Sequence, residues 1–572
     1  MSLLPKIMSI LALFCLFEGI ALADVLPGPA MPEQVGRALQ SEEQQPSQSG
    51  PPAVSSQEKP QTPVGEEAEK IKFKLNGIIL EGNHVYTTQQ LMPLYNNQLN
   101  KTITVADLFG IVQNITNYYR NNGYIISRAI LPPQHVKNGV VKIQIIEGYL
   151  SQVDVSGHPR GTKCLIKVYG KKIQEKRPLQ INRMEKYLYL ANEIPATQVK
   201  AVLSPSKTDV GAADLTLVTE NKPITGYVSY DDYGTRYIGP QQMTANLAFS
   251  SLVGSGDLTQ ITVTKTPKGS ELTFVDINES TQITDEGARW LLGGTRVQTH
   301  PLFVLQPVDI VGRNNNYYTT INFPVMRSRG ENFTFRTGFN YLDSYVTTLG
   351  SPLYTDHLRN LDLGLTYNFA DHLYGANLIN IDFRQGLPML GYSQSHNPYT
   401  AQTSRPGGRA NYTKFTLQAS RLQAFKGPVS LFGTASGQYA FNPLLASEQF
   451  SFGGSQIGRG YDVAELIGDR GLSGSLELRW DINMNIERLF MRMMQPYIFY
   501  DIGVIWNILA LGDTPVKQSA SSTGFGVRLF ATKYLSATLT WAQPLTKTVA
   551  TEALIGDGWH PRMFFSVVAE FG

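Results

Sequence analysis

The strongest constraint in this sequence is an alternation of apolar and polar residues that begins at Pro223 and continues to Gly572. Residues two apart lie on the same face of a strand, so the pattern predicts many β-strands with one apolar and one polar face. A soluble sandwich also alternates, but several segments here are longer than its strands usually are. About sixteen segments can be counted, an even number that suits a closed barrel with lipid outside and polar groups inside. Region 222–572 is therefore predicted to be an all-β, transmembrane antiparallel barrel of about sixteen strands.

Composition agrees with a β-rich protein. Only 17% of the residues are charged, whereas Gly (51), Tyr (28) and Phe (26) are prominent. The formal net charge is +3 and no run of five basic residues occurs, so nothing indicates a nucleic-acid partner.

The first residues have the pattern of a secretory signal peptide, which we expect over 1–23. Lys6 precedes an apolar run from Ile7 to about Phe17, and the small residues Ala21 and Ala23 form an A-x-A cleavage site. The apolar run is too short to span a bilayer. No later stretch is long and apolar enough for a transmembrane helix, which leaves a barrel as the way to cross a membrane.

Two weakly structured segments follow the signal peptide. Residues 24–40 contain a short helix candidate at Glu33 to Leu39, and residues 41–70 are rich in Pro, Gln, Ser and Glu. The second composition is typical of a flexible linker. We therefore expect a helix tethered by a linker, with a disordered tail as the alternative.

Residues 71–148 and 149–221 both indicate small α/β modules. In the first, Thr104 and Asp107 form a variant capping box for an amphipathic helix that ends at Asn122-Gly123, and strands are expected at 124–131 and 140–146. The second repeats the β-α-α-β-β order, although its first helix cannot be recognised.

One glycine-rich stretch, Phe450 to Gly471, carries the candidate site. It contains Arg459, and the later strand around Asp501 places Ile498, Tyr500, Ile502 and Val504 on the apolar face. Positions 499, 501 and 503 (Phe499, Asp501 and Gly503) must then face inward, since a carboxylate facing lipid would be costly. A loop cation and an inward carboxylate suggest a buried pair between Arg459 and Asp501.

At this point the sequence resembles the outer-membrane transporters of two-partner secretion, the haemolysin and filamentous-haemagglutinin exporters, within the BamA-like outer-membrane-assembly superfamily. The first module is similar to a POTRA domain at 118–124, 128–134 and 146–148, and the second at 203–205 and 211–215. Matching barrel segments are 231–234, 252–257, 324–329 and 442–449. The resemblance covers nearly the whole mature chain and implies a 16-stranded barrel preceded by two POTRA modules.

The resemblance also implies roles for the candidate site. Arg459, Gly460 and Tyr461 keep the family's V-R-G-[FY] loop motif, with Gly458 at the position where Val is typical, and Phe499, Asp501 and Gly503 keep its F-x-D-x-G strand motif. In the family the loop folds into the lumen and the arginine pairs with the aspartate as a conformational lock. The helix near 32–40 would plug the lumen at rest.

By the same resemblance, the POTRA modules would lie in the periplasm of a Gram-negative cell and recognise the N-terminal secretion domain of an exported protein. Tyr124 and Ile125, on an expected pairing strand, are the candidate client-binding residues, because such modules can add a client as an extra strand. The client would pass through the barrel of a monomer in outer-membrane lipid, without ATP. For Glu477 and Arg479 the simplest interpretation is the lining of a wet lumen.

Two alternatives remain from the sequence: a factor that inserts other barrels into the membrane, and a passive porin-like barrel. An enzyme is not indicated. The eight histidines form no H-E-x-x-H motif, no Cys pair accompanies them, and no P-loop occurs. We therefore expect no catalytic residue, metal or cofactor.

Overall fold

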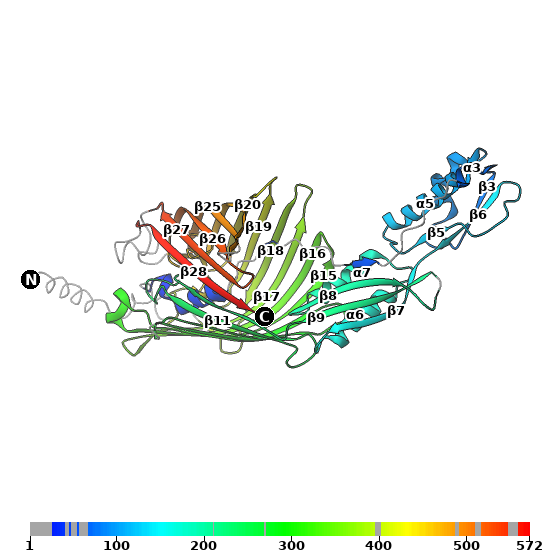
Figure 1. Cartoon of the computed structure of the whole chain (residues 1–572). Helices are drawn as coiled ribbons and strands as arrows, with labels where there is room; N and C mark the ends of the chain where they lie inside the picture. Colours follow the sequence, from blue (N-terminus) through cyan, green and yellow to red (C-terminus); the bar gives the residue numbers. More distant parts are fainter. Residues whose placement is uncertain are drawn as a thin grey trace, which may run out of the picture.

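The computed structural model describes residues 26–40, 45–46, 54–56, 67–209, 211–267, 270–394, 402–486, 491–509, 516–546 and 559–572. The expected signal peptide at 1–23, and most of the expected linker at 41–70, lie outside these ranges. Figure 1 shows a barrel, one α/β module against one of its ends, and a second α/β module beyond the first.

The C-terminal region forms a closed antiparallel barrel, as the alternation predicts. The structure describes sixteen barrel strands when β23 and β24 are counted as one. These two segments are separated only by Asp481, and both pair with β25. The barrel strands are β10 (Ile224–Asp231), β11 (Gln242–Ser250), β12 (Leu258–Lys265), β13 (Leu272–Gln282), β14 (Arg289–Thr299), β15 (Ile310–Arg327), β16 (Glu331–Thr348), β17 (Ser351–Ala370), β18 (Gly375–Gly386), β19 (Thr413–Ala424), β20 (Val429–Ala440), β23 (Arg470–Trp480), β24 (Ile482–Ile486), β25 (Met491–Trp506), β26 (Lys517–Phe530), β27 (Leu535–Pro544) and β28 (Arg562–Phe571). Pairing of β10 with β28 closes the barrel, so no edge strand is left open.

The two faces of the wall have opposite chemistry. On β25 the outward side chains of Ile498 and Ile502 are 58% and 52% exposed, whereas the inward Asp501 is fully buried. On β23, Leu472 faces outward and Glu477 is buried in the lumen. No helix within the described ranges is long and apolar enough to cross a membrane.

The module farther from the barrel contains a helix, α5, that packs on a three-stranded sheet. Thr104 and Asp107 form the expected capping box at the start of α5. The elements are α3 (Glu67–Lys70), β2 (Lys72–Lys74), β3 (Gly77–Glu81), α4 (Thr88–Leu91), the 3-10 turns η3 (Met92–Leu94) and η4 (Asn96–Gln98), β4 (Thr102–Thr104), α5 (Val105–Asn121), β5 (Arg128–Ile130) and β6 (Val140–Ile146). The sheet order is β3-β6-β5, so β3 and β5 are its edges.

The module next to the barrel has two helices on its sheet, including the one that the sequence did not reveal. Its elements are β7 (Tyr149–His158), α6 (Lys163–Gln174), α7 (Ile181–Asn192), β8 (Thr197–Pro205) and β9 (Ala212–Asn221). The start of α6 has no side-chain cap, because Thr162 makes no capping bond. Linker residues Val54–Ser56 form β1, which pairs in parallel with β8.

Ion pairs join this second module to turns at one end of the barrel. The carboxylate of Glu286, in the turn between β13 and β14, accepts hydrogen bonds from Lys186 Nζ at 2.6 Å and Tyr187 Oη at 2.9 Å. Arg327 at the end of β15 donates to Glu193 at 2.6 Å. Because the second module contacts this end, and the modules of the resembled family lie in the periplasm, we call it the periplasmic end and its opposite the extracellular end.

The segment before the modules lies inside the barrel. The short 3-10 turn η2 (Gly28–Ala30) leads into α2 (Pro32–Gln40), which packs against β14 and β15. Five residues at the start of α2, Pro32 to Gly36, are buried there.

Candidate functional site

The long connection between β20 and β23, residues 441–469, folds back into the lumen. It contains the 3-10 turn η6 (Ala446–Glu448) and a small hairpin of β21 (Phe450–Phe452) and β22 (Leu466–Gly468). Phe450 and Phe452 pack with Ile505 of the wall in one hydrophobic cluster. A Cβ on wall residue Gly503 would lie 2.2 Å from the ring of Phe452. A glycine in the wall at position 503 is therefore what lets the loop approach so closely.

Arg459 lies in the connection between β21 and β22 and is buried at the centre of the site. Its Nε donates to Asp501 Oδ2 at 3.0 Å and its Nη2 to Asp501 Oδ1 at 2.8 Å, a bidentate pair. Its Nη1 donates to Glu477 Oε2 at 2.6 Å, and its Cζ lies 3.5 Å from the ring centroid of Phe499. The planar guanidinium is thus held at its edge by carboxylates and at its face by an aromatic ring, a combination that lysine cannot reproduce.

Asp501 is satisfied by the loop backbone as well. The amides of Gly458 and Arg459 donate to its Oδ2 at 3.1 and 3.0 Å. Together with the guanidinium, these amides surround a carboxylate that is 0% exposed. A buried charge that is both paired and hydrogen-bonded avoids the penalty of an orphaned one, so this arrangement favours a single position of the loop.

Glu477 belongs to the same cluster, which we call the lock cluster: Arg459, Glu477 and Asp501. Its Oε1 also accepts from Arg479 and Arg528, both at 2.7 Å. The interpretation of Glu477 as lining of a wet lumen is therefore wrong, because its side chain is 3% exposed and forms ion pairs with three arginines. Inward parity on β23, next to the strand of Asp501, indicates that Glu477 points into the lumen near Asp501, but not that a loop arginine reaches it.

The residues after Arg459 fasten the loop to other strands. Tyr461 Oη donates to the carbonyl of Ser521 at 2.8 Å and accepts from the amide of Thr546 at 3.1 Å. A Cβ on Gly460 would lie 2.9 Å from the nitrogen of Pro544. Asp462 then forms ion pairs with Arg236 at 2.8 Å and Arg562 at 3.0 Å. The loop is thereby connected to β26, to the end of β27 and to both sides of the β10–β28 closure.

The electrostatic balance of Arg459 favours its charged form. Burial lowers the pKa of this guanidinium, but the hydrogen bonds to Asp501 and the charges of Asp501 and Glu477 outweigh burial and raise the pKa above its ordinary value. No group of three His, Cys, Asp or Glu side chains in the described ranges could hold a metal ion. Because its guanidinium is held by two buried carboxylates, the site has the chemistry of a structural clamp.

Gly458 stands where the resembled V-R-G-[FY] motif has Val, and its backbone conformation suits glycine. Its φ is +85°, a region that favours glycine. A Cβ there would lie 2.9 Å from the nitrogen of Gly453. In this chain the glycine thus directs its amide at Asp501 without strain.

We expect Gly458→Val to loosen the loop, because a β-branched residue at positive φ costs about 1–3 kcal/mol. Protease cleavage within 441–469 on intact cells should increase several-fold, and secretion should fall. Gly433→Val is the matched control, because Gly433 faces outward and a Cβ there would meet only Leu476 at 3.5 Å. Equal cleavage in the two variants would contradict this account of Gly458.

The helix in the lumen holds the same loop. Arg37 donates to the carbonyls of Ser447 at 3.0 Å and Gln449 at 2.6 Å, and to Ser451 Oγ at 3.2 Å. Gln34 donates to the carbonyl of Ala446. The loop segment 446–451 is thus bound from the helix side by two side chains that the sequence reasoning did not single out.

The wall provides partners for both the helix and the loop. Glu33 accepts hydrogen bonds from Tyr354 at 2.8 Å and Ser344 at 3.0 Å. Burial raises the pKa of Glu33 despite these bonds and the charge of Arg37. Glu448 in η6 pairs with Arg384 at 3.0 Å and Lys414 at 2.8 Å. Helix and loop together occupy a polar region of the lumen, in which Arg37, Glu33 and Glu448 all have partners.

The expected client-binding residues are placed differently from the prediction. Tyr124 and Ile125 do not lie on a strand, because β5 begins only at Arg128. Gly123 has a φ of +89°, and the Ser127 amide donates to the Tyr124 carbonyl, so the chain turns here instead of extending. Tyr124 Oη accepts from Gln180 at 2.9 Å, and Ile125 packs on the core of the second module. The two residues therefore form the junction of the modules.

Comparison with known proteins agrees with this architecture. Residues 211–529 match the family model of the haemolysin secretion/activation protein ShlB/FhaC/HecB, and residues 73–148 match the POTRA domain of ShlB type. The heme/hemopexin transporter protein HuxB of Haemophilus influenzae is 21% identical over 498 residues, 84% of this chain and 85% of HuxB. The outer membrane transporter CdiB of Dickeya dadantii is 25% identical over 399 residues, 67% of this chain and 68% of CdiB.

The solved structure of CdiB from Escherichia coli has a similar fold. It superposes with a TM-score of 0.68 at 19% identity and covers 90% of this chain and 93% of that one.

Proposed function

The chain belongs to the haemolysin secretion/activation family of ShlB/FhaC/HecB type, and we propose that it exports one large partner protein through its barrel, with the helix α2 as a removable plug. It is an outer-membrane transporter of a secreted partner protein, with its POTRA modules in the periplasm. Transport would require no chemical reaction and no nucleotide. Folding of the client outside the cell would supply the driving force.

One observation carries the proposal: a tethered helix fills the lumen of a closed barrel. Residues Pro32 to Gly36 are buried against the wall and the loop, and Val35 among them packs in a small apolar cluster with Phe274 and Val297. Beside this apolar contact, the polar side chains Glu33 and Arg37 are held by hydrogen bonds, which water can replace when the helix leaves the lumen. We infer that α2 leaves the lumen toward the periplasm when a client arrives.

We propose that the client, through an N-terminal secretion domain, adds as a strand to a sheet edge of the periplasmic modules. The β3-β6-β5 sheet ends at β5, Arg128–Ile130. Strand addition uses main-chain hydrogen bonds and makes few demands on client sequence. Tyr124 and Ile125 would contribute by fixing the junction of the modules just before this edge. The transporter would work as a monomer surrounded by outer-membrane lipid.

The lock cluster has a separate role in the proposal. Arg459, with Gly460 and Tyr461, would hold the loop against the wall strand of Phe499, Asp501 and Gly503 while the plug moves. Support comes from the different partners of loop and plug: the loop tip binds Asp501 and Glu477, whereas α2 binds segment 446–451. Release of α2 therefore leaves the lock cluster intact.

Deletion of the gene tests the proposed function. We expect the culture supernatant to lose one large protein and the barrel composition of the outer membrane to stay unchanged. Depletion of many outer-membrane barrels would instead indicate an assembly factor. An unchanged supernatant with reduced uptake of small solutes would indicate a passive porin. Restoration of secretion by the full-length gene is the control.

A further inference from the structure

A groove runs along the outer face of the barrel between β19 and β26. Two adjoining cavities of about 430 and 850 Å³ form it, and Leu417, Gly437 and Leu472 line both. These volumes are within the roughly 300–1,000 Å³ that is typical of ligand sites. The groove faces away from the lumen, because Leu417 and Leu472 are 49% and 58% exposed on the outward side of their strands.

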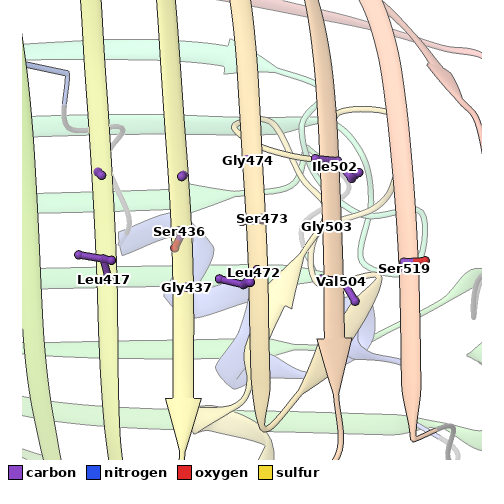
Figure 2. Close-up of a pocket in the computed structure, with 12 residues that line it drawn as sticks. Leu417, Ser436, Gly437, Leu472, Ser473, Gly474, Ile502, Gly503, Val504 and Ser519 are labelled. Atoms are coloured by element: carbon purple, nitrogen blue, oxygen red, sulfur yellow. The ribbon is translucent and has the colours of Figure 1, made fainter.

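Small outward residues on neighbouring strands create the groove. Figure 2 shows Leu417 on β19, Leu472 on β23, and Ile502 and Val504 on β25, with positions 437 and 474 among them, where glycine has no side chain. By register, Gly474 lies opposite Ala435 and Gly437 opposite Leu472. A lipid-facing wall lined by large side chains would leave no such depression. Here the wall itself has space for an apolar chain.

The extracellular end of the groove is cationic and aromatic. Arg470 begins β23 and Lys517 begins β26, both at the end of the barrel opposite the modules. The Arg470 guanidinium lies 4.1 Å from the ring centroid of Tyr439, and Lys517 Nζ lies 5.8 Å from that of Trp506. In the part of the chain that the structure describes, neither cation has a carboxylate partner within 4.0 Å. Tyr439, Arg470 and Trp506 line the same cavity as Leu417.

The Arg470 Nε also donates to the Ala440 carbonyl at 2.9 Å, a bond that leaves its charge without a carboxylate. The groove thus changes from an apolar wall to cations without described carboxylate partners, which matches the acyl chain and phosphate of an anionic lipid. We propose that the groove binds a phosphate-bearing lipid of the outer leaflet, with an acyl chain along Gly437 and Gly474 and a phosphate at Arg470 and Lys517. Basic groups near a membrane surface attract anionic headgroups, and apolar chains gain from a complementary surface. The proposal rests on the outer-membrane location and not on the identity of the client.

Lipid binding to the purified full-length protein tests the proposal. The probe is hexa-acylated lipid A with two phosphates, compared with the same lipid after removal of its phosphates, and binding is measured by native mass spectrometry. We expect the phosphorylated lipid to bind more tightly. The double variant Arg470→Gln, Lys517→Gln should lose about tenfold in affinity and its preference for phosphate. Lys426→Gln, an exposed cation at the periplasmic end, is the control.

A second variant tests the apolar part independently of charge. Gly474→Leu fills the groove, and a Cβ there would be no nearer than 3.4 Å to another atom, so the barrel should still fold. We expect it to reduce binding of both lipids. Gly433→Leu makes the same change outside the groove and should bind as the parent does. Binding by Gly474→Leu equal to that of Gly433→Leu, or an unchanged phosphate preference in the double variant, would overturn the proposal.

Discussion

Arg459→Ala should reduce secretion of the partner protein by tenfold or more while the barrel still folds. Removing one member of a buried ion pair costs about 3–5 kcal/mol, because the remaining charges are left without a partner. Asp501 would keep only the two loop amides, and these would lose the guanidinium that fixes their position. Partner protein in the supernatant gives the secretion readout, and heat-modifiable migration on gels shows that the barrel is folded.

Two further variants separate charge from geometry. Arg459→Lys keeps the charge but cannot bind Asp501 bidentately, reach Glu477 and cover Phe499 together, so it should resemble Arg459→Ala. Arg409→Ala removes an exposed arginine from another extracellular loop and should secrete normally. Normal secretion by Arg459→Ala would show that the lock cluster has no part in transport. The exchange Arg459→Asp with Asp501→Arg should not restore function, because Asp501 also accepts from two amides.

Strand periodicity was sufficient to predict the barrel and the inward direction of Asp501. A residue on a transmembrane strand faces either lipid or lumen, so the parity of Ile498 and Ile502 determines that of Asp501. The loop cation and the inward carboxylate suggest the pair between Arg459 and Asp501, and the family resemblance supports the pair and implies its role as a lock. The role of Glu477 was missed, because parity indicates only that a side chain points inward. Whether it meets water or a folded-back loop depends on tertiary contacts.

The short helix shows a different limit of sequence reasoning. Met31, Val35 and Leu39 recur every four residues and pack in apolar clusters of the lumen, so the covered face of α2 does include an apolar stripe. Periodicity can indicate this stripe, but it does not indicate that the polar residues Glu33 and Gln34 beside it are also buried, at 3% and 1% exposed. The incorrect strand at Tyr124 and Ile125 has a local cause, since the left-handed Gly123 redirects the chain after α5. The β-propensity of Tyr124, Ile125 and Ile126 favours a strand here, but propensity takes no account of this turn.

The double variant Gln34→Ala, Arg37→Ala should give a barrel that conducts ions at rest. Together these side chains donate four hydrogen bonds to residues 446–451. Each hydrogen bond that involves a charged group contributes about 1.5–3 kcal/mol, so their loss should shift α2 toward the released state. Planar-bilayer conductance should increase several-fold and approach that of a variant lacking residues 32–40.

A matched control on the same helix distinguishes loss of these contacts from general damage to α2. Gln40→Ala removes a side chain that binds Thr295 of the wall and not the loop, so it should change conductance much less. Because Arg37 binds the carbonyls of Ser447 and Gln449, the double variant should also make segment 446–451 more accessible to protease, whereas the Arg459 tip stays protected by Asp501. Increased conductance without this local exposure would mean that plug and loop are released independently, and that the contacts between them do not keep the barrel closed.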